Sequence, residues 1–207
     1  MGADFTRKPI DDDGEHALLS LKMKRSKLLC MLLVLMSLST GCRKKPVGAV
    51  TPLHLAAEQG DIEQVQSLIE NGAEINSRDQ FGQTPLERAV FAGHIQIVEL
   101  LIASGADINT KNHSGRTPLH VCALRGYQDI AKALIDKGAD IEAKNNKGLT
   151  PLHIAVLFGQ KGVVELLISK GASANMKDND GNTPIALAKN RGYTEIEVFL
   201  RRHEIKE

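Results

Sequence analysis

The feature that most constrains the fold of this chain is a motif that returns every 33 residues. The heptad TPLHLAA begins at Thr51, and related heptads begin at Thr84, Thr117, Thr150 and Thr183. Self-similarity at such a period is the signature of a repeat architecture, in which each unit buries its apolar face only by packing on its neighbours. We therefore expect five stacked units that start near residues 46, 79, 112, 145 and 178.

Each unit predicts two helices. Threonine is a good N-cap, and the proline after it suits the first helical position. A glycine nine residues after each threonine breaks the chain before a second helix, whose apolar stripe is illustrated by Ile95, Val98, Leu101 and Ile102. Small residues share one position of the first helix, which lets the first helices of neighbouring units pack closely: Ala56, Ala89, Cys122, Ala155 and Ala188.

These motifs resemble those of the ankyrin-repeat family, from about Pro46 to the C-terminus. The resemblance implies an all-α repeat solenoid, with a helix-turn-helix and a β-hairpin or turn in each repeat. In that family the histidine of TPLH bonds the backbone of the next repeat, which implies a structural role for His54, His120 and His153. Repeats 2 and 5 carry Glu87 and Ala186 there, so we expect those two junctions to be tied less well.

The resemblance also implies where a partner protein would bind, because ankyrin repeats use the turn tips and the end of the first helix. At the end of the first helices lie Phe91, Leu124, Arg125, Leu157 and Phe158, and we place Phe81 and Leu149 at the tips. Three of the four phenylalanines of the repeat region thus fall on the expected contact face. The alternative is that these side chains pack against neighbouring hairpins.

No motif predicts catalysis. The three histidines stand in separate repeats, too far apart to share a metal ion, and the sequence DNDGN lacks two calcium ligands of a calcium-binding loop. Cys122 replaces a small buried residue. From Arg43 onward, 20 Lys and Arg balance 20 Asp and Glu, unlike a nucleic-acid-binding surface. We expect no enzyme activity, cofactor, metal, nucleic acid or small-molecule substrate.

The N-terminal region predicts export. The uncharged segment 28–38 is shorter than the ~20 residues of a membrane-spanning helix but matches the ~7–15 residues of a signal peptide. MKRSK precedes it, and LSTGC ends it at Cys42. Residues 23–41 resemble a bacterial lipoprotein signal peptide, which implies cleavage before Cys42 and acyl chains on that residue. Ser39 departs from the leucine that the family prefers, so an ordinary signal peptide or an uncleaved anchor is an alternative.

The domain organisation follows from these segments. We expect residues 1–22 to be an extension upstream of a true start at Met23, residues 42–50 to be a lipidated linker, and residues 51–207 to be the repeat domain. Arg43 after the cysteine favours the outer membrane, facing the periplasm. Without lipidation, the chain would be a soluble cytoplasmic adaptor.

Two functions fit these features. The first is an envelope-anchored module that binds or regulates another exported protein. The second is a structural or protective envelope protein that binds several clients weakly.

Overall fold

The computed structural model describes residues 48–204, all of which lie within one unit of the chain, Lys45–Glu207. Cys42 and the segments 1–22 and 23–41 lie outside the described residues. Within this range ten helices form five pairs: α2 (Pro52–Gln59) and α3 (Ile62–Glu70), α4 (Pro85–Ala92) and α5 (Ile95–Ala103), α6 (Pro118–Arg125) and α7 (Gln128–Asp136), α8 (Pro151–Leu157) and α9 (Lys161–Ser169), α10 (Pro184–Arg191) and α11 (Thr194–Glu204). None of these helices is long and apolar enough to cross a membrane.

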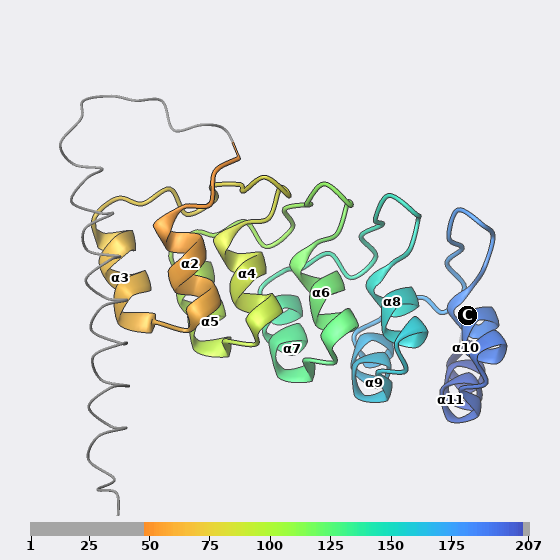
Figure 1. Ribbon diagram of the computed structural model, residues 1–207. Coiled ribbons are helices and arrows are strands. Elements are labelled where there is room, and N and C mark those ends of the chain that lie inside the picture. The colour runs from red at the N-terminus through yellow and green to blue at the C-terminus, as the bar shows by residue number, and fades with distance from the viewer. Residues whose placement is uncertain (1–47, 205–207) are drawn as a thin grey trace, which may run out of the picture. The chain divides into compact units, whose positions relative to one another are not determined.

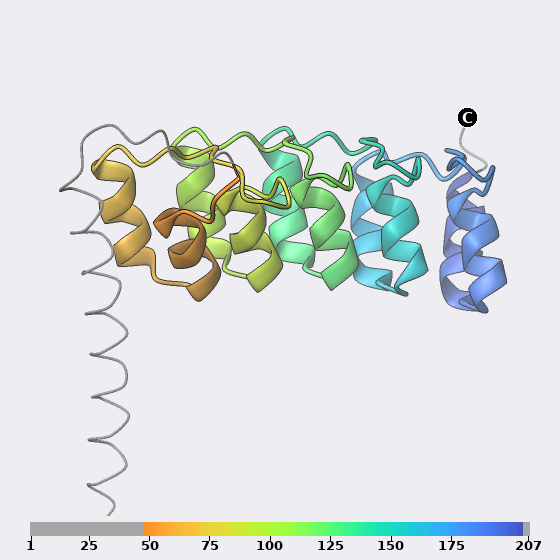
Figure 2. The same cartoon turned by 45° about the horizontal axis from the view of Figure 1, so that its top comes forward.

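The helices stack in two rows. The first helices of consecutive pairs contact one another in order, from α2 through α4, α6 and α8 to α10, and the second helices do the same. Figure 1 shows this succession, and Figure 2 shows the connecting turns in a row along one edge of the repeats. The expected helical repeat solenoid is confirmed.

Local sequence explains the helix boundaries. Each first helix begins after a threonine in extended conformation and has proline at its first position, as at Thr84 and Pro85. The Thr84 hydroxyl accepts a hydrogen bond from the Glu87 amide at 3.3 Å, which satisfies one of the free amides of the first turn. The same helix ends at Gly93, whose φ of 84° is in the left-handed region that glycine adopts without strain.

The core lies between the two rows of helices. The five small residues of the first helices are all fully buried (Ala56, Ala89, Cys122, Ala155 and Ala188), so the close packing expected of them is present. In α5, Val98 and Leu101 are buried, but Ile95 is 36% exposed, so its place in the buried stripe is wrong. Ile95 opens the helix and points away from the first-helix row, whereas Ile97 fills the core.

The connections between repeats are tight turns. The described residues contain no strand, and an isolated bridge joins Gly48 to Asp79. One side chain holds each turn by accepting two backbone amides, and in the DNDGN segment Asp178 Oδ1 accepts those of Asp180 at 3.0 Å and Asn182 at 2.8 Å. This aspartate therefore organises its own turn.

Candidate functional site

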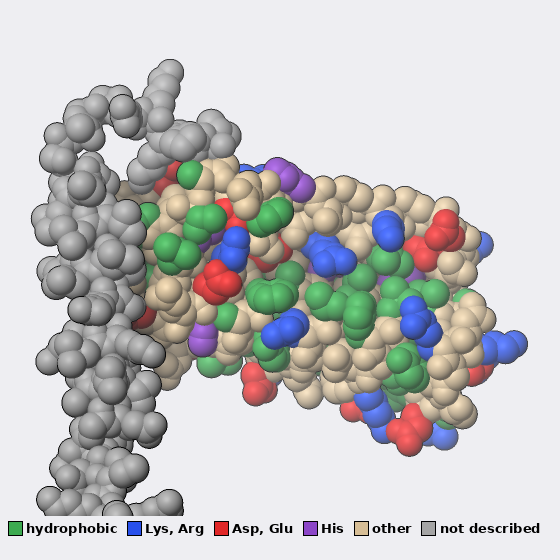
Figure 3. All heavy atoms as spheres, viewed as in Figure 1, with side chains coloured by type: hydrophobic (Ala, Val, Ile, Leu, Met, Phe, Trp, Pro, Cys, Tyr) green, Lys and Arg blue, Asp and Glu red, His purple; other side chains and the backbone are tan. Residues whose placement is uncertain are grey.

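The ends of the first helices form a surface of mixed apolar and basic character, which we call the first-helix face. It is defined by Phe91, Leu124, Arg125, Leu157 and Phe158, from α4, α6 and α8 or the residue that follows. Phe91 is 42% exposed and Phe158 is 53% exposed. Figure 3 shows hydrophobic side chains gathered over α4, α6 and α8, with Lys and Arg among them.

Arg125 lies between two aromatic rings of this face. Its guanidinium carbon is 4.6 Å from the ring centre of Phe91 and 5.8 Å from that of Tyr127. Both distances are within the range of a cation–π interaction. Arg125 is nevertheless exposed, so the repeat 2–3 boundary offers an aromatic surface and a positive charge side by side.

The two leucines of the face serve the fold as well as the surface. Leu124 is half-buried and packs against the core, and Leu157 is half-buried too. For Leu124, the alternative of packing within the repeats is therefore partly correct. A charged residue at Leu124 would lower stability as well as change the surface, which makes the two exposed phenylalanines the better positions for mutation.

The turn tips differ from the expectation at one of two positions. Phe81 lies at a tip and is 56% exposed. Leu149 does not lie at a tip. Its amide bonds the Asn145 side chain, its carbonyl accepts from His120, and its half-buried side chain packs on the core. Leu149 directly precedes the N-cap threonine, so it stands at the base of its turn, and the residue in register with Phe81 is Ser114 or Lys147.

A charged cluster that the sequence reasoning missed borders the first-helix face. Arg88 donates to the buried Asp79 carboxylate at 2.5 and 3.2 Å and to Glu58 at 2.9 Å. Burial alone would raise the pKa of Asp79, but hydrogen bonds from Arg88 and the amides of Gln83 and Phe81 lower it below its usual value. The available signal was the register, because Arg88 stands where other repeats carry leucine, valine or isoleucine.

The three TPLH histidines connect consecutive repeats. Their Nε2 atoms bond carbonyls of the next repeat: His54 to Gln83 at 3.0 Å, His120 to Leu149 at 3.0 Å and His153 to Asn182 at 3.2 Å. Each Nδ1 accepts a backbone amide and pairs with the N-cap threonine hydroxyl at 2.8–2.9 Å. Nε2 therefore carries the proton and donates it to the carbonyl.

This geometry requires neutral imidazoles. Burial lowers the pKa of all three histidines, opposed in each case by the hydrogen bond to the next repeat, and the pKa of His120 falls to about 4. A protonated Nδ1 would have no lone pair for the threonine amide. The histidines are thus structural groups that oppose protonation.

The junction at Glu87 is better tied than expected. The Glu87 side chain is 2% exposed, and its Oε1 accepts from Asn112 Nδ2 of the next repeat at 2.6 Å and from Gln83 Nε2 at 3.3 Å. The prediction of a weak junction was wrong because a carboxylate reaches a side chain where histidine reaches a carbonyl. Burial raises the pKa of Glu87 to about 7, against the lowering effect of these two hydrogen bonds. At Ala186 no described repeat follows, so that position joins nothing.

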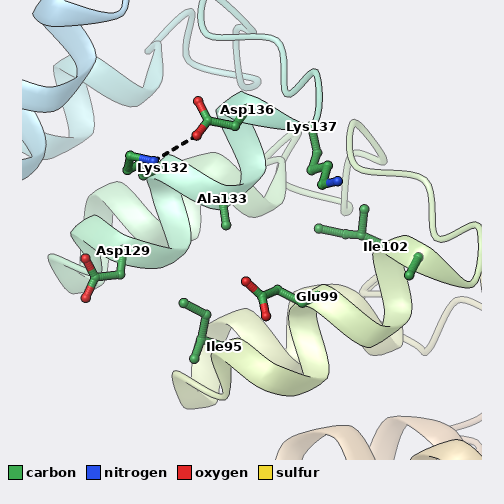
Figure 4. Close-up of a pocket in the computed structure, with 9 residues that line it drawn as sticks. Ile95, Glu99, Ile102, Asp129, Lys132, Ala133, Asp136 and Lys137 are labelled. Carbon is green, nitrogen blue, oxygen red and sulfur yellow. Dashed lines mark hydrogen bonds and ion pairs between the residues drawn. The ribbon is translucent and has the colours of Figure 1, made fainter.

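The second helices form an opposite surface, the second-helix face, which carries a groove between α5 and α7. The groove has a volume of about 660 Å³, and Ile95, Ile102 and Ala133 supply its apolar lining. Figure 4 shows Glu99 projecting between the helices and the Lys132–Asp136 ion pair, 3.0 Å long, at the rim. No histidine or cysteine lines the groove.

The described residues hold no arrangement suited to metal or nucleophilic chemistry. Within 48–204 no three histidine, cysteine or acidic side chains are placed to share a metal ion. Cys122 is fully buried, and burial raises the pKa of its thiol far above the ordinary value, so it stays protonated. The first-helix face is therefore suited to contact rather than to covalent chemistry.

Comparisons with known proteins agree with this geometry. A family model described as ankyrin repeats (3 copies) matches residues 19–112, 53–145, 104–178 and 143–206. No curated protein matches the sequence. Repeats of this type are generally protein–protein interaction modules and are generally not catalytic.

Proposed function

Because the chain belongs to the ankyrin-repeat family, we propose that it is a non-catalytic binding module that holds or regulates another protein through its first-helix face. We further propose that Cys42 anchors this module in a bacterial cell envelope, where the partner is another exported protein. The two parts of the proposal rest on different observations and are tested separately.

One observation carries the binding function: large aromatic side chains are exposed on the first-helix face although the chain has few of them. Phe91, Phe158 and the tip residue Phe81 are between 42% and 56% exposed. Aromatic residues beside arginine are the groups most often found at the energetic centres of protein interfaces. Their alignment along consecutive repeats gives a partner a continuous surface.

Site-specific photo-crosslinking in living cells tests the binding surface. A photo-reactive amino acid replaces Phe91 in the full chain, and the matched control replaces Ile95, which is also exposed but lies on the second-helix face. We expect a discrete adduct from position 91 and none from position 95. A ladder of many adducts would favour the weak-client function. No adduct from position 91, or an equal yield from both positions, would contradict the proposed surface.

The sequence LSTGC, which follows an uncharged segment and ends at Cys42, carries the anchoring part. Each buried CH₂ of an acyl chain contributes about 0.8 kcal/mol, so two or more chains hold a protein firmly on a membrane. Intact mass of the protein extracted from membranes tests this, beside the variant Cys42→Ser. We expect the mass of residues 42–207 plus acyl chains, lost in the variant. An unmodified mass, or one that includes residues 23–41, would contradict the anchor.

A further inference from the structure

The near-neutral charge of the repeats hides a separation of charge between their two halves. The segments that form the turns and first helices carry ten Lys and Arg against six Asp and Glu, whereas those that form the second helices and the loops after them carry six against thirteen. The first set comprises residues 48–60, 76–93, 109–126, 142–159 and 175–192, and the second set comprises the stretches between and after them. The side that bears the first-helix face is therefore the basic side.

Burial and pairing strengthen this difference. Of the six acidic residues on the basic side, Asp79 and Glu87 are buried, and Glu142 and Asp178 are partly buried. Glu58 is exposed but bonds Arg88 at 2.9 Å. Eight cations on the same side are exposed: Arg78, Lys111, Arg125, Lys144, Lys147, Lys177, Lys189 and Arg191. Solvent and a partner therefore meet a surface that is more positive than the residue count suggests.

Some of these cations are held in a row. Arg78 donates to the carbonyl of Lys111, Lys111 Nζ to that of Lys144 at 2.9 Å, and Lys144 Nζ to that of Lys177 at 3.1 Å. Each side chain thus reaches one repeat onward, and one positive charge is held at each of three successive junctions. A neutral acceptor leaves the charge uncompensated, so each cation remains available to an anion.

We propose that the first-helix face binds an extended protein segment that is rich in Asp and Glu and carries apolar side chains. The carboxylates lie along the row of cations, and the apolar side chains contact Phe91 and Phe158. This inference rests on the proposed function, whose partner it specifies. A nucleic acid is disfavoured, because the sequence pI is about 7.8 and the other face is acidic, whereas nucleic-acid-binding domains carry a strong basic excess.

A random peptide library tests the chemistry of the partner without knowledge of its identity. Peptides of about 16 residues, displayed on phage, are selected on the purified full chain held in detergent. We expect the enriched peptides to combine acidic with aromatic or aliphatic residues. The variant Arg125→Glu/Lys147→Glu should bind them about tenfold more weakly or worse. The control Lys137→Glu/Arg202→Glu makes the same change in net charge at exposed residues of the second-helix face and should bind them normally.

The outcomes separate this inference from the proposed function. Enriched peptides that are neutral or basic, but lose binding in Phe91→Ser, would overturn the acidic partner and leave the first-helix face in place. Peptides that bind all variants alike, or no enrichment at all, would count against both. Loss of binding in the second-helix control as large as in the first-helix variant would also overturn the proposal. A 30-nucleotide single strand that binds and is lost in Arg125→Glu/Lys147→Glu would replace the peptide as the occupant.

Discussion

The junctions between repeats fall into two kinds that occupy the same place in the stack. At three of them a neutral histidine joins the N-cap threonine of its own repeat to a carbonyl of the next, as His120 joins Thr117 to Leu149. Between repeats 2 and 3 a buried carboxylate, Glu87, binds Asn112 instead. The difference teaches that the backbone of a repeat specifies where the next repeat must be held, but not the chemistry that holds it.

A second contrast is found in the loops after the second helices. Asn76 and Asn109 each accept a backbone amide of the next repeat through Oδ1 at 2.8 Å and donate Nδ2 to a carbonyl at 3.2–3.3 Å. Glu142 stands in the same register and accepts the Ser173 amide at 2.6 Å, but its buried Oε2 has no hydrogen-bond partner. Here the acidic residue supplies half of what the asparagines supply.

The largest expected effect comes from removing a histidine junction. His120→Ala would remove the cap bonds of α6 and leave the buried Leu149 carbonyl without its donor. We expect the free energy of unfolding to fall by about 4 kcal/mol, the sum of a lost cap and an unpaired buried group with the cavity beside it. Urea denaturation at pH 7 measures it. A loss below about 1 kcal/mol would mean that the histidine junctions do not hold the repeats together.

Acid should weaken the histidine junctions. The pKa of His120 is lowered to about 4 in the folded state from 6.5, so the unfolded chain binds a proton first as the pH falls. Stability is present above pH 6.5 and is lost between pH 6.5 and 4, by about 3 kcal/mol for this residue. The comparison is between wild type and His120→Gln in denaturant titrations across this range. Parallel profiles would contradict the assignment.

The carboxylate junction should respond in the opposite direction. The pKa of Glu87 is raised from 4.5 to about 7, so its contribution is complete below pH 4.5 and is lost as the pH rises to 7. Glu87→Gln keeps an oxygen for Asn112 and carries no charge. We expect it to stabilise the protein by about 2 kcal/mol at pH 8, less than the full linkage because its own amide must be hydrogen-bonded. No gain at pH 8 over pH 4.5 would refute the buried charge.

The smallest expected effect concerns Glu142. Burial raises the pKa of its carboxyl, against the lowering effect of the Ser173 amide. Because the raised pKa favours the protonated form, this junction weakens as the pH rises. Glu142→Gln supplies an N–H in place of the unpartnered oxygen and should stabilise the protein by about 1 kcal/mol at pH 7.5. Asn109→Asp is the matched opposite change and should destabilise it, and equal signs for the two variants would contradict the register argument.

Sequence reasoning predicted the repeats, their helices and the buried small residues, because these depend on residues within one repeat and on a period that is visible in the text. It failed where an outcome depends on a neighbour in the next repeat. Glu87 looked like a weak junction because its partner, Asn112, is 25 residues away and has no spacing rule. Leu149 looked like a tip residue because its half-buried contacts are also with other segments. Cys42 lies outside the described residues, and its lipidation stays a prediction.

The constant offset between partners across each junction bears on how many repeats the chain can have. Removal of residues 112–144 would bring repeat 2 against repeat 4, and Glu87 would meet Asn145, an asparagine in the same register as Asn112. Duplication of that repeat would keep the pairing as well. Placing Glu87 before an aspartate, such as Asp178, would instead oppose two carboxylates. Recombination can therefore lengthen or shorten this protein at some boundaries and not at others, and one side chain decides which.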